Sequence, residues 1–317
     1  MKIQPLTQDR LEEAAELFIQ KFKHLREVIP ILPDNMEDKS QVISRLESMV
    51  NQGRSLAAVE DNHLVGYLVW FINDDFRGTG RKAAYCPEWG HAAKTGQSSE
   101  IYLSMYRQAA HIWSQLGCKT HAITYYTNDR ILADFLFWNG FGLTVVDAVR
   151  EINFNVEHTT TLAVRRAQLS DAGLIALLDK ENSGHYSRPP TLMAVHQPNS
   201  VAEIAEFLSQ QGNSYWLAEA EGLPAGFMRF EEGSAAPFSS VRSPNTMTIT
   251  GAYTRPQFRG RGAATTLLQA ALRAYAEQGY QRCSVDFESL NPEASAFWLK
   301  YFEPVCYSAI RYPEFYL

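Results

Sequence analysis

Cysteine, excess positive charge and long apolar runs are all scarce in this sequence, and each shortage excludes a class of protein. The four cysteines are Cys86, Cys118, Cys283 and Cys306. They lie far apart without metal-ligand spacing, so we expect free, buried thiols and no metal site. The net charge is −6 and basic runs are absent, which argues against a nucleic-acid partner. No apolar run could span a membrane, and the start "MKIQPLTQDR" has no apolar signal core, so we expect a cytoplasmic protein without a membrane partner.

What the sequence does contain is typical of a globular protein with more than one domain. Its 317 residues exceed what most single cores need, and its apolar content is 45% against 20% charged residues. Composition says nothing about oligomeric state.

The two halves of the sequence resemble each other. "LAAVEDNHLVGYLVWF" (56–71) is similar to "WLAEAEGLPAGFMRF" (216–230), and "FLFWNGFG" (135–142) is similar to "AFWLKYFE" (296–303). The matching residues lie about 160 positions apart in each case, as expected for a duplicated domain. We therefore predict two domains, 1–155 and 160–317, joined within the polar stretch 153–161.

The second half predicts a mixed α/β (α+β) fold with a mostly antiparallel sheet. We expect the order β-α-α-β-β-β-α-β-α-β, with Ser170 or Asp171 capping the first helix and Gly279 ending the third. Pro292 is expected to begin the last helix. The segment 183–200 is rich in proline, so we expect it to be irregular.

The stretch "QFRGRGAA" (257–264) joins an expected strand to an expected helix and has little side-chain bulk. The first turn of a helix presents unpaired N–H groups, and glycines let a phosphate approach them. Three interpretations are open: a dinucleotide site built on a partial G-x-G-x-x-G, a tight turn with solvated arginines, or a site for another diphosphate. The missing third glycine and the late position in the fold disfavour the first.

The same stretch, read as Gln257–Gly262, resembles the [Q/R]-x-x-G-x-[G/A] signature of the GNAT (Gcn5-related N-acetyltransferase) superfamily. Asn291, Ala294 and the aromatic residues after them resemble its second signature. The resemblance implies two tandem GNAT-like acyl-CoA N-acyltransferase domains, with acetyl-CoA as the co-substrate and an amine acceptor, either a small molecule or a protein amine. The acyl-CoA site that it implies consists of Ala252, Tyr253, Thr254, Gln257, Phe258, Arg259, Gly260, Arg261, Gly262, Ala263, Ala264, Asn291, Phe297 and Trp298.

In the resembled family, a backbone amide near residues 252–254 polarises the thioester carbonyl, and the fourth and fifth strands splay to admit the pantetheine arm. Many members carry a tyrosine on the last helix as an acid, but Trp298 occupies that position here. Our candidates for the acid and base are therefore Tyr301 and Glu288, with Asp286 on the same strand face as Glu288. His185, Tyr186 and His196 lie where family members border the acceptor.

The first half resembles a degenerate copy of the same domain. Pro87 and Gly90 are expected to correspond to Pro256 and Gly260, while bulky Trp89 and His91 would obstruct a ligand. We therefore expect one working site per chain and direct transfer in a ternary complex, without a covalent intermediate. The alternative is an acyl-CoA-binding sensor or scaffold that performs no transfer.

Overall fold

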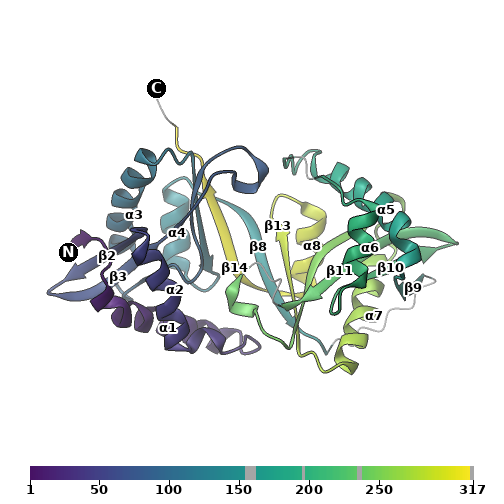
Figure 1. The fold of residues 1–317 in the computed structure, drawn as a ribbon, viewed down its shortest axis with the longest axis horizontal. Coiled ribbons are helices and arrows are strands. Elements are labelled where there is room, and N and C mark those ends of the chain that lie inside the picture. Colours follow the sequence, from purple (N-terminus) through teal and green to yellow (C-terminus); the bar gives the residue numbers. More distant parts are fainter. Residues whose placement is uncertain (154–161, 195–196, 234–237, 315–317) are drawn as a thin grey trace. The chain divides into compact units, whose positions relative to one another are not determined.

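The computed structural model describes residues 1–153, 162–194, 197–233 and 238–314 (Figure 1). The expected junction falls largely outside these ranges, and so does His196. The chain divides into two compact units. Unit 1 comprises Met1–Asp147, Phe238–Ser240 and Pro304–Leu317, and unit 2 comprises Ala148–Pro237 and Val241–Glu303.

Unit 1 contains a small antiparallel sheet and part of a larger one. The small sheet has the order β1-β2-β3-β6, and the strands of the larger sheet follow in the order β4-β5-β7-β14-β8. The strands are β1 (Lys2–Gln4), β2 (Ser55–Glu60), β3 (His63–Val69), β4 (Phe71–Asn73), β5 (Ala83–Cys86), β6 (His91–Ala93), β7 (Thr120–Tyr126), most of β8 (Gly142–Glu151) and β14 (Glu303–Arg311). The helices are α1 (Leu11–Val28), α2 (Lys39–Asn51), α3 (Ser98–Gln115) and α4 (Arg130–Trp138).

Unit 2 is built on strands that follow in the order β8-β13-β12-β11-β10-β9, where β8 contributes only its last residues. The strands are β9 (Ala163–Arg166), β10 (Ser214–Ala220), β11 (Leu223–Glu232), β12 (Thr246–Thr254) and β13 (Arg282–Glu288). The helices are α5 (Ala172–Tyr186), α6 (Val201–Ser209), α7 (Ala263–Glu277) and α8 (Pro292–Tyr301). The element order expected for the second half is confirmed, as is the mixed α/β class.

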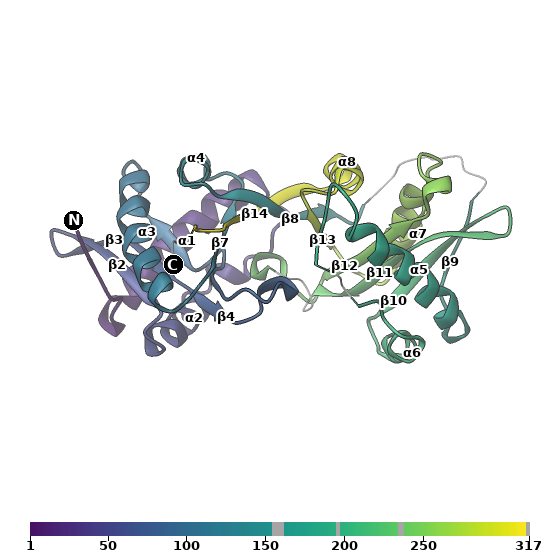
Figure 2. The same ribbon diagram turned by 90° about the horizontal axis from the view of Figure 1, so that it is seen from above.

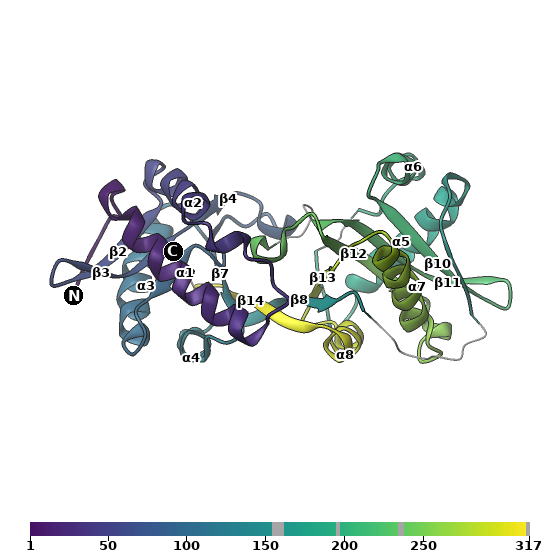
Figure 3. The ribbon, with the colours of Figure 1, turned by 90° about the horizontal axis from the view of Figure 1, so that it is seen from below.

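Helices cover both faces of the unit 2 sheet. Helix α7 packs across β9 to β12, and Figures 2 and 3 show α6 on the opposite side of these strands. Alternation along β10 explains the arrangement, because Ser214 and Trp216 contact Tyr275 of α7 while Tyr215 packs against Phe207 of α6. The apolar face of α7 is buried and consists of Leu267, Leu268, Ala271, Leu272 and Tyr275.

The helix termini follow the expected signals, with one correction. Asp171 is the N-cap residue of α5, although its side chain makes no capping hydrogen bond to that helix. Gly279 follows α7 with φ +89°, and Pro292 begins α8. The expectation that irregular structure begins at residue 183 is wrong, because α5 continues to Tyr186 and the prolines that end it come only at 189 and 190. His185 and Tyr186 are therefore helical.

The last strand of the chain lies in unit 1. Strand β14 pairs antiparallel with β7, from Cys306 opposite Tyr126 to Arg311 opposite His121. Phe238–Ser240 also belongs to unit 1, where the Ser240 hydroxyl lies 3.0 Å from that of Tyr126. The domain ranges 1–155 and 160–317 stay a prediction about the sequence repeat. The compact units do not follow these ranges, because residues 238–240 and the β14 segment belong to unit 1.

All four cysteines are free and buried, as predicted. Within the described ranges, none of the helices is both long and apolar enough to cross a bilayer. Over the same residues, no group of His, Cys, Asp or Glu side chains is placed to hold a metal ion.

Candidate acyl-CoA site

Two glycines shape the loop that leads from β12 into α7. A short 3-10 turn, Pro256–Phe258, follows the strand and is anchored by the buried ring of Phe258. Gly260 then takes φ +70° and Gly262 takes φ +86°, in the left-handed region that side chains disfavour. Gly262 is the N-cap of α7, and a Cβ on Gly260 would meet no atom within 4 Å. The loop is therefore bare and open at Gly260.

Several consecutive backbone amides of this loop donate no hydrogen bond within the described residues. The amides of Phe258 and Arg259 donate to the carbonyls of Arg255 and Pro256 at 2.9 and 3.2 Å. The next amide that finds a partner is that of Thr266, which donates to the Gly262 carbonyl at 2.9 Å. Among the described residues, no acceptor serves the amides of residues 260–265. Together with the helix dipole, these donors favour an anion.

Strands β12 and β13 separate beside this loop. Their parallel pairing runs from Thr246 opposite Arg282 to Ile249 opposite Val285 and ends there. Strand β12 continues to Thr254 but is paired in this stretch only with β11, after a register shift between Arg229 and Phe230 of that strand. Residues 252–254, which the family resemblance selected, lie in the part of β12 that does not pair with β13, and Glu288 lies in β13 beyond its last pair with β12.

The end of α5 lies beside the carboxyl end of β13. Burial raises the pKa of Tyr186, and the charges of Glu288 and Asp286 raise it further, while a hydrogen bond with the Asn291 side chain lowers it. Asn291 is buried and caps α8, since its Oδ1 accepts from the Ala294 amide at 3.2 Å. Asn291 therefore links α5 to the start of α8, beside the two carboxylates.

His185 lies near the loop. Burial lowers the pKa of this imidazole, and the positive charge of Arg259 lowers it further, whereas Glu293 raises it. Sequence reasoning missed the contribution of Glu293, although an acidic residue in the first turn of a helix is a recognisable signal.

The aromatic residues of α8 divide into two groups. Trp298 is 5% exposed and packs against Phe302, with ring centroids 5.4 Å apart. Tyr301 instead reaches the first turn of α7, where its hydroxyl lies 3.2 Å from Thr265 Oγ1. Phe297 is half-buried and packs edge-on against Tyr301 at 5.1 Å.

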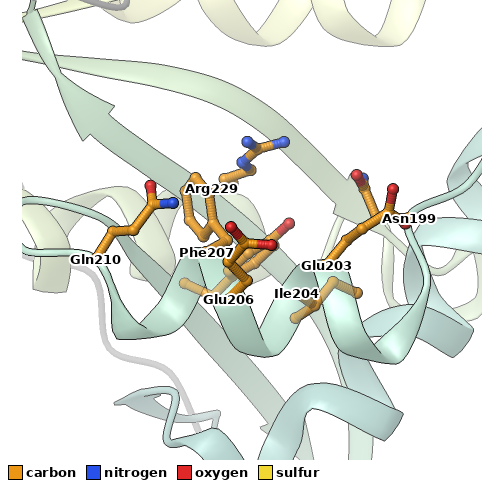
Figure 4. A pocket seen from close by; sticks show the side chains of 8 residues that line it. Asn199, Glu203, Ile204, Glu206, Phe207, Gln210 and Arg229 are labelled. Atoms are coloured by element: carbon orange, nitrogen blue, oxygen red, sulfur yellow. The ribbon is translucent and has the colours of Figure 1, made fainter.

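A separate cavity of about 160 Å³ lies between α6 and strands β10 and β11 (Figure 4). Its lining includes Phe207 and Arg229, whose guanidinium carbon lies 4.0 Å from the Phe207 ring centroid. Arg229 also forms an ion pair with Glu231 at 3.0 Å. The cavity contains none of the residues that the sequence selected.

Comparison with known proteins identifies the second half. Residues 178–302 match the model of the Acetyltransferase (GNAT) family, and this range runs from α5 to the end of α8. This region is similar to GNAT acetyltransferases. The match and the N-acetyltransferases among the relatives support an acyltransferase enzyme, and the matched family uses acetyl-CoA.

One curated relative is similar to part of this chain, and two solved structures are similar in fold to nearly all of it. The uncharacterized N-acetyltransferase YjgM of Escherichia coli (strain K12) is 29% identical over 136 residues, which are 43% of this chain and 77% of that protein. The crystal structure of a GCN5-related N-acetyltransferase from Sphaerobacter thermophilus has a TM-score of 0.57 at 12% identity, covering 100% of this chain and 97% of that one. A glucosamine N-acetyltransferase region of a fungal multi-domain protein has a TM-score of 0.54 at 11% identity, covering 98% of this chain and 38% of that one. These two structures share the fold along nearly the whole length.

Proposed function

We propose that the chain transfers an acetyl group from acetyl-CoA to an amine at one site, in unit 2. The observation that carries the proposal is the row of unpartnered amides at 260–265, opened by two left-handed glycines beside the point where β12 and β13 part. The amides suit the CoA diphosphate, and the unpaired edge of β12 at Ala252–Thr254 suits the pantetheine arm and thioester.

In the proposed reaction the neutral amine attacks the thioester carbonyl, the C–S bond breaks, and CoA leaves as a thiolate that takes up a proton. A backbone amide in 252–254 would stabilise the developing oxyanion. Glu288 is the proposed base that takes the proton from the attacking nitrogen. For Tyr301 we propose a positioning role instead of proton donation, because its hydroxyl already contacts Thr265.

The corresponding region of unit 1 supports a single working site. Strands β5 and β7 pair in parallel as far as Cys86 opposite Ile123, which resembles the pairing of β12 and β13. Immediately beyond, the imidazole of His91 donates from Nε2 to the Thr124 carbonyl at 2.9 Å and accepts at Nδ1 from the Tyr102 hydroxyl at 3.0 Å. The space next to β7 is therefore filled by a buried side chain.

An ion pair between Lys21 and Asp129 also occupies the space next to β7. Lys21 Nζ lies 3.5 Å from His91 Nδ1 and 3.3 Å from the carboxylate of Asp129, the N-cap of α4. Asp129 holds the position in unit 1 that Asn291 holds in unit 2, because each residue caps the helix that follows the second strand of the parallel pair, β7 or β13. A ligand would have to displace a partly buried lysine and a buried histidine, which is costly.

The expected correspondence between Gly90 and Gly260 is wrong. Helix α3 begins at Ser98, with Gln97 as its N-cap, whereas Gly90 precedes β6 and is buried. A Cβ on Gly90 would meet Pro87 Cδ at 2.7 Å. The residue of unit 1 most comparable to Gly260 is Gly96, which has φ +91° and open space around it.

The test is a matched pair of substitutions. Gly260→Asp places a carboxylate among the loop amides, so it should reduce acetyl-CoA binding at least about tenfold. Gly96→Asp imposes a similar backbone strain before α3 and should leave binding unchanged. Calorimetric titration of acetyl-CoA should give one site per chain, and free-thiol release with a panel of polyamines and amino sugars should identify the acceptor class.

Other outcomes contradict specific parts of the proposal. Two sites per chain would contradict a filled unit 1, and equal losses in the two variants would remove the loop at 260 from the site. Binding without thiol release for any amine would favour the sensor alternative.

A further inference from the structure

The two arginines that flank Gly260 have different surroundings. Arg259 is engaged on both sides, since its Nε donates to the Thr254 carbonyl at 3.1 Å and its Nη1 lies 3.0 Å from Glu293 Oε1. Arg261 is exposed, and among the described residues no carboxylate pairs with it. Its guanidinium carbon lies over the Phe258 ring, at a distance of 6.0 Å from the ring centroid. One of these positive charges is therefore neutralised and the other is available.

Helix α8 contacts the loop at both of its ends. The first contact is the Arg259–Glu293 ion pair, which joins residue 259 to the first turn of α8. The second is the contact of 3.2 Å between Thr265 Oγ1 and the Tyr301 hydroxyl, which joins the first turn of α7 to the last turn of α8. The six unpartnered amides lie between these two points. Helix α8 therefore sets the spacing of the loop on which the amides are presented.

Acetyl-CoA has a phosphate group in addition to the diphosphate that the loop amides would bind. In the proposed function the amides bind the diphosphate, which leaves the phosphate monoester on the ribose 3′-oxygen. At neutral pH such a group carries nearly two negative charges, and an arginine binds it well. A guanidinium already paired with a carboxylate offers less to that phosphate than a free one does.

We infer that the two arginines have separate roles: Arg259, held by Glu293, positions the loop, and Arg261 binds the 3′-phosphate of CoA and so selects CoA over its 3′-dephospho form. This inference rests on the proposed function. It adds a positioning pair and a specificity-determining residue to that site.

The role of Arg261 is tested by comparing acetyl-CoA with acetyl-3′-dephospho-CoA. The unchanged protein should bind acetyl-CoA about tenfold more tightly, and Arg261→Gln should abolish this preference by weakening acetyl-CoA alone. Arg259→Gln should weaken both donors by a similar factor and keep the preference. A preference retained in Arg261→Gln, or lost only in Arg259→Gln, would overturn the assignment.

The role of the Arg259–Glu293 pair is tested by the sign of the change in KM. If Glu293 positions the loop, Glu293→Gln raises the KM of both donors several-fold with kcat unchanged, and adding Arg259→Gln makes little further difference. If Arg259 is instead a phosphate ligand that Glu293 restrains, freeing it lowers KM, which would overturn the proposal. Glu277→Gln removes the exposed partner of Arg273 on α7 and serves as the control, with no change expected in KM.

Failure of the inference and failure of the proposed function give different results. If the unchanged protein does not bind acetyl-CoA, the proposed function fails before the variants are compared. If it binds and turns over acetyl-CoA but the variants do not behave as stated, only the division between the arginines fails. Melting temperatures of all variants should lie close to that of the unchanged protein, because Arg261 is exposed and the Arg259–Glu293 pair is partly exposed.

Discussion

At the scale of single residues, the core of unit 1 contains a buried histidine, His121, with polar partners. The His121 Nδ1 accepts from the Tyr106 hydroxyl at 2.9 Å, and Arg311 donates to the same hydroxyl at 2.8 Å. Burial lowers the pKa of His121 to about 4, and the charge of Arg311 adds to the effect. This imidazole is therefore kept neutral in the folded protein.

The neutral state of His121 makes stability depend on pH. The unfolded chain binds a proton on this residue below about pH 6.5, whereas the folded chain does so only near pH 4, so stability falls as the pH is lowered between these values. From pH 7 to pH 5 the loss from this residue should be about 2 kcal/mol. His121→Gln should lower stability at pH 7 but reduce the pH dependence, measured by urea unfolding at the two values. An unchanged slope would contradict the prediction.

At the scale of elements, the caps and apolar faces of the second half could be predicted from sequence because they are local. The face of α7, the start of α8 at Pro292 and the Gly-rich loop each depend on residues within one or two turns. The separation of β12 from β13, and the contact of α5 with Asn291, depend on residues more than 30 positions apart and have no local signal. The false match of Gly90 with Gly260 arose because both follow a proline, whereas helix α3 begins eight residues later.

Asn291 contributes both to the stability of α8 and to the geometry of the proposed acetyl-CoA site. Asn291→Ala removes the cap of α8 and the link to Tyr186, and should cost about 1 kcal/mol in stability. Because α8 also holds the loop, the KM for acetyl-CoA should rise several-fold. Ser200→Ala is the matched control, since Ser200 caps α6 through the Glu203 amide, away from the loop. It should cost similar stability with KM unchanged, and equal effects on KM would show that α8 has no special role.

At the scale of the whole molecule, the fold of unit 1 depends on residues from the far end of the sequence. Sequence repeats predicted two self-contained halves, but they could not reveal that β14 pairs with β7, because pairing partners of equal apolar character are indistinguishable in sequence. Ala309 of β14 is 4% exposed and belongs to the core of unit 1.

A charge at Ala309 should therefore damage unit 1 before unit 2. Ala309→Asp buries a carboxylate in that core and should cost about 3 kcal/mol or more. Hydrogen exchange should accelerate in β7 and α3 while β10 and β11 retain their protection. Ala296→Asp, on an exposed position of α8, is the control and should change neither pattern. Faster exchange confined to β10 and β11 would contradict the placement of β14.

The position of β14 also fixes the order in which the protein can mature on the ribosome. The other strands of unit 1 end by residue 151, yet strand β14, which pairs with β7, begins only at residue 303. While about half the chain is synthesised, one edge of β7 has unpaired backbone N–H and C=O groups. Such an edge can pair with strands of other molecules. Unit 1, although encoded first, is therefore the unit that completes its fold last.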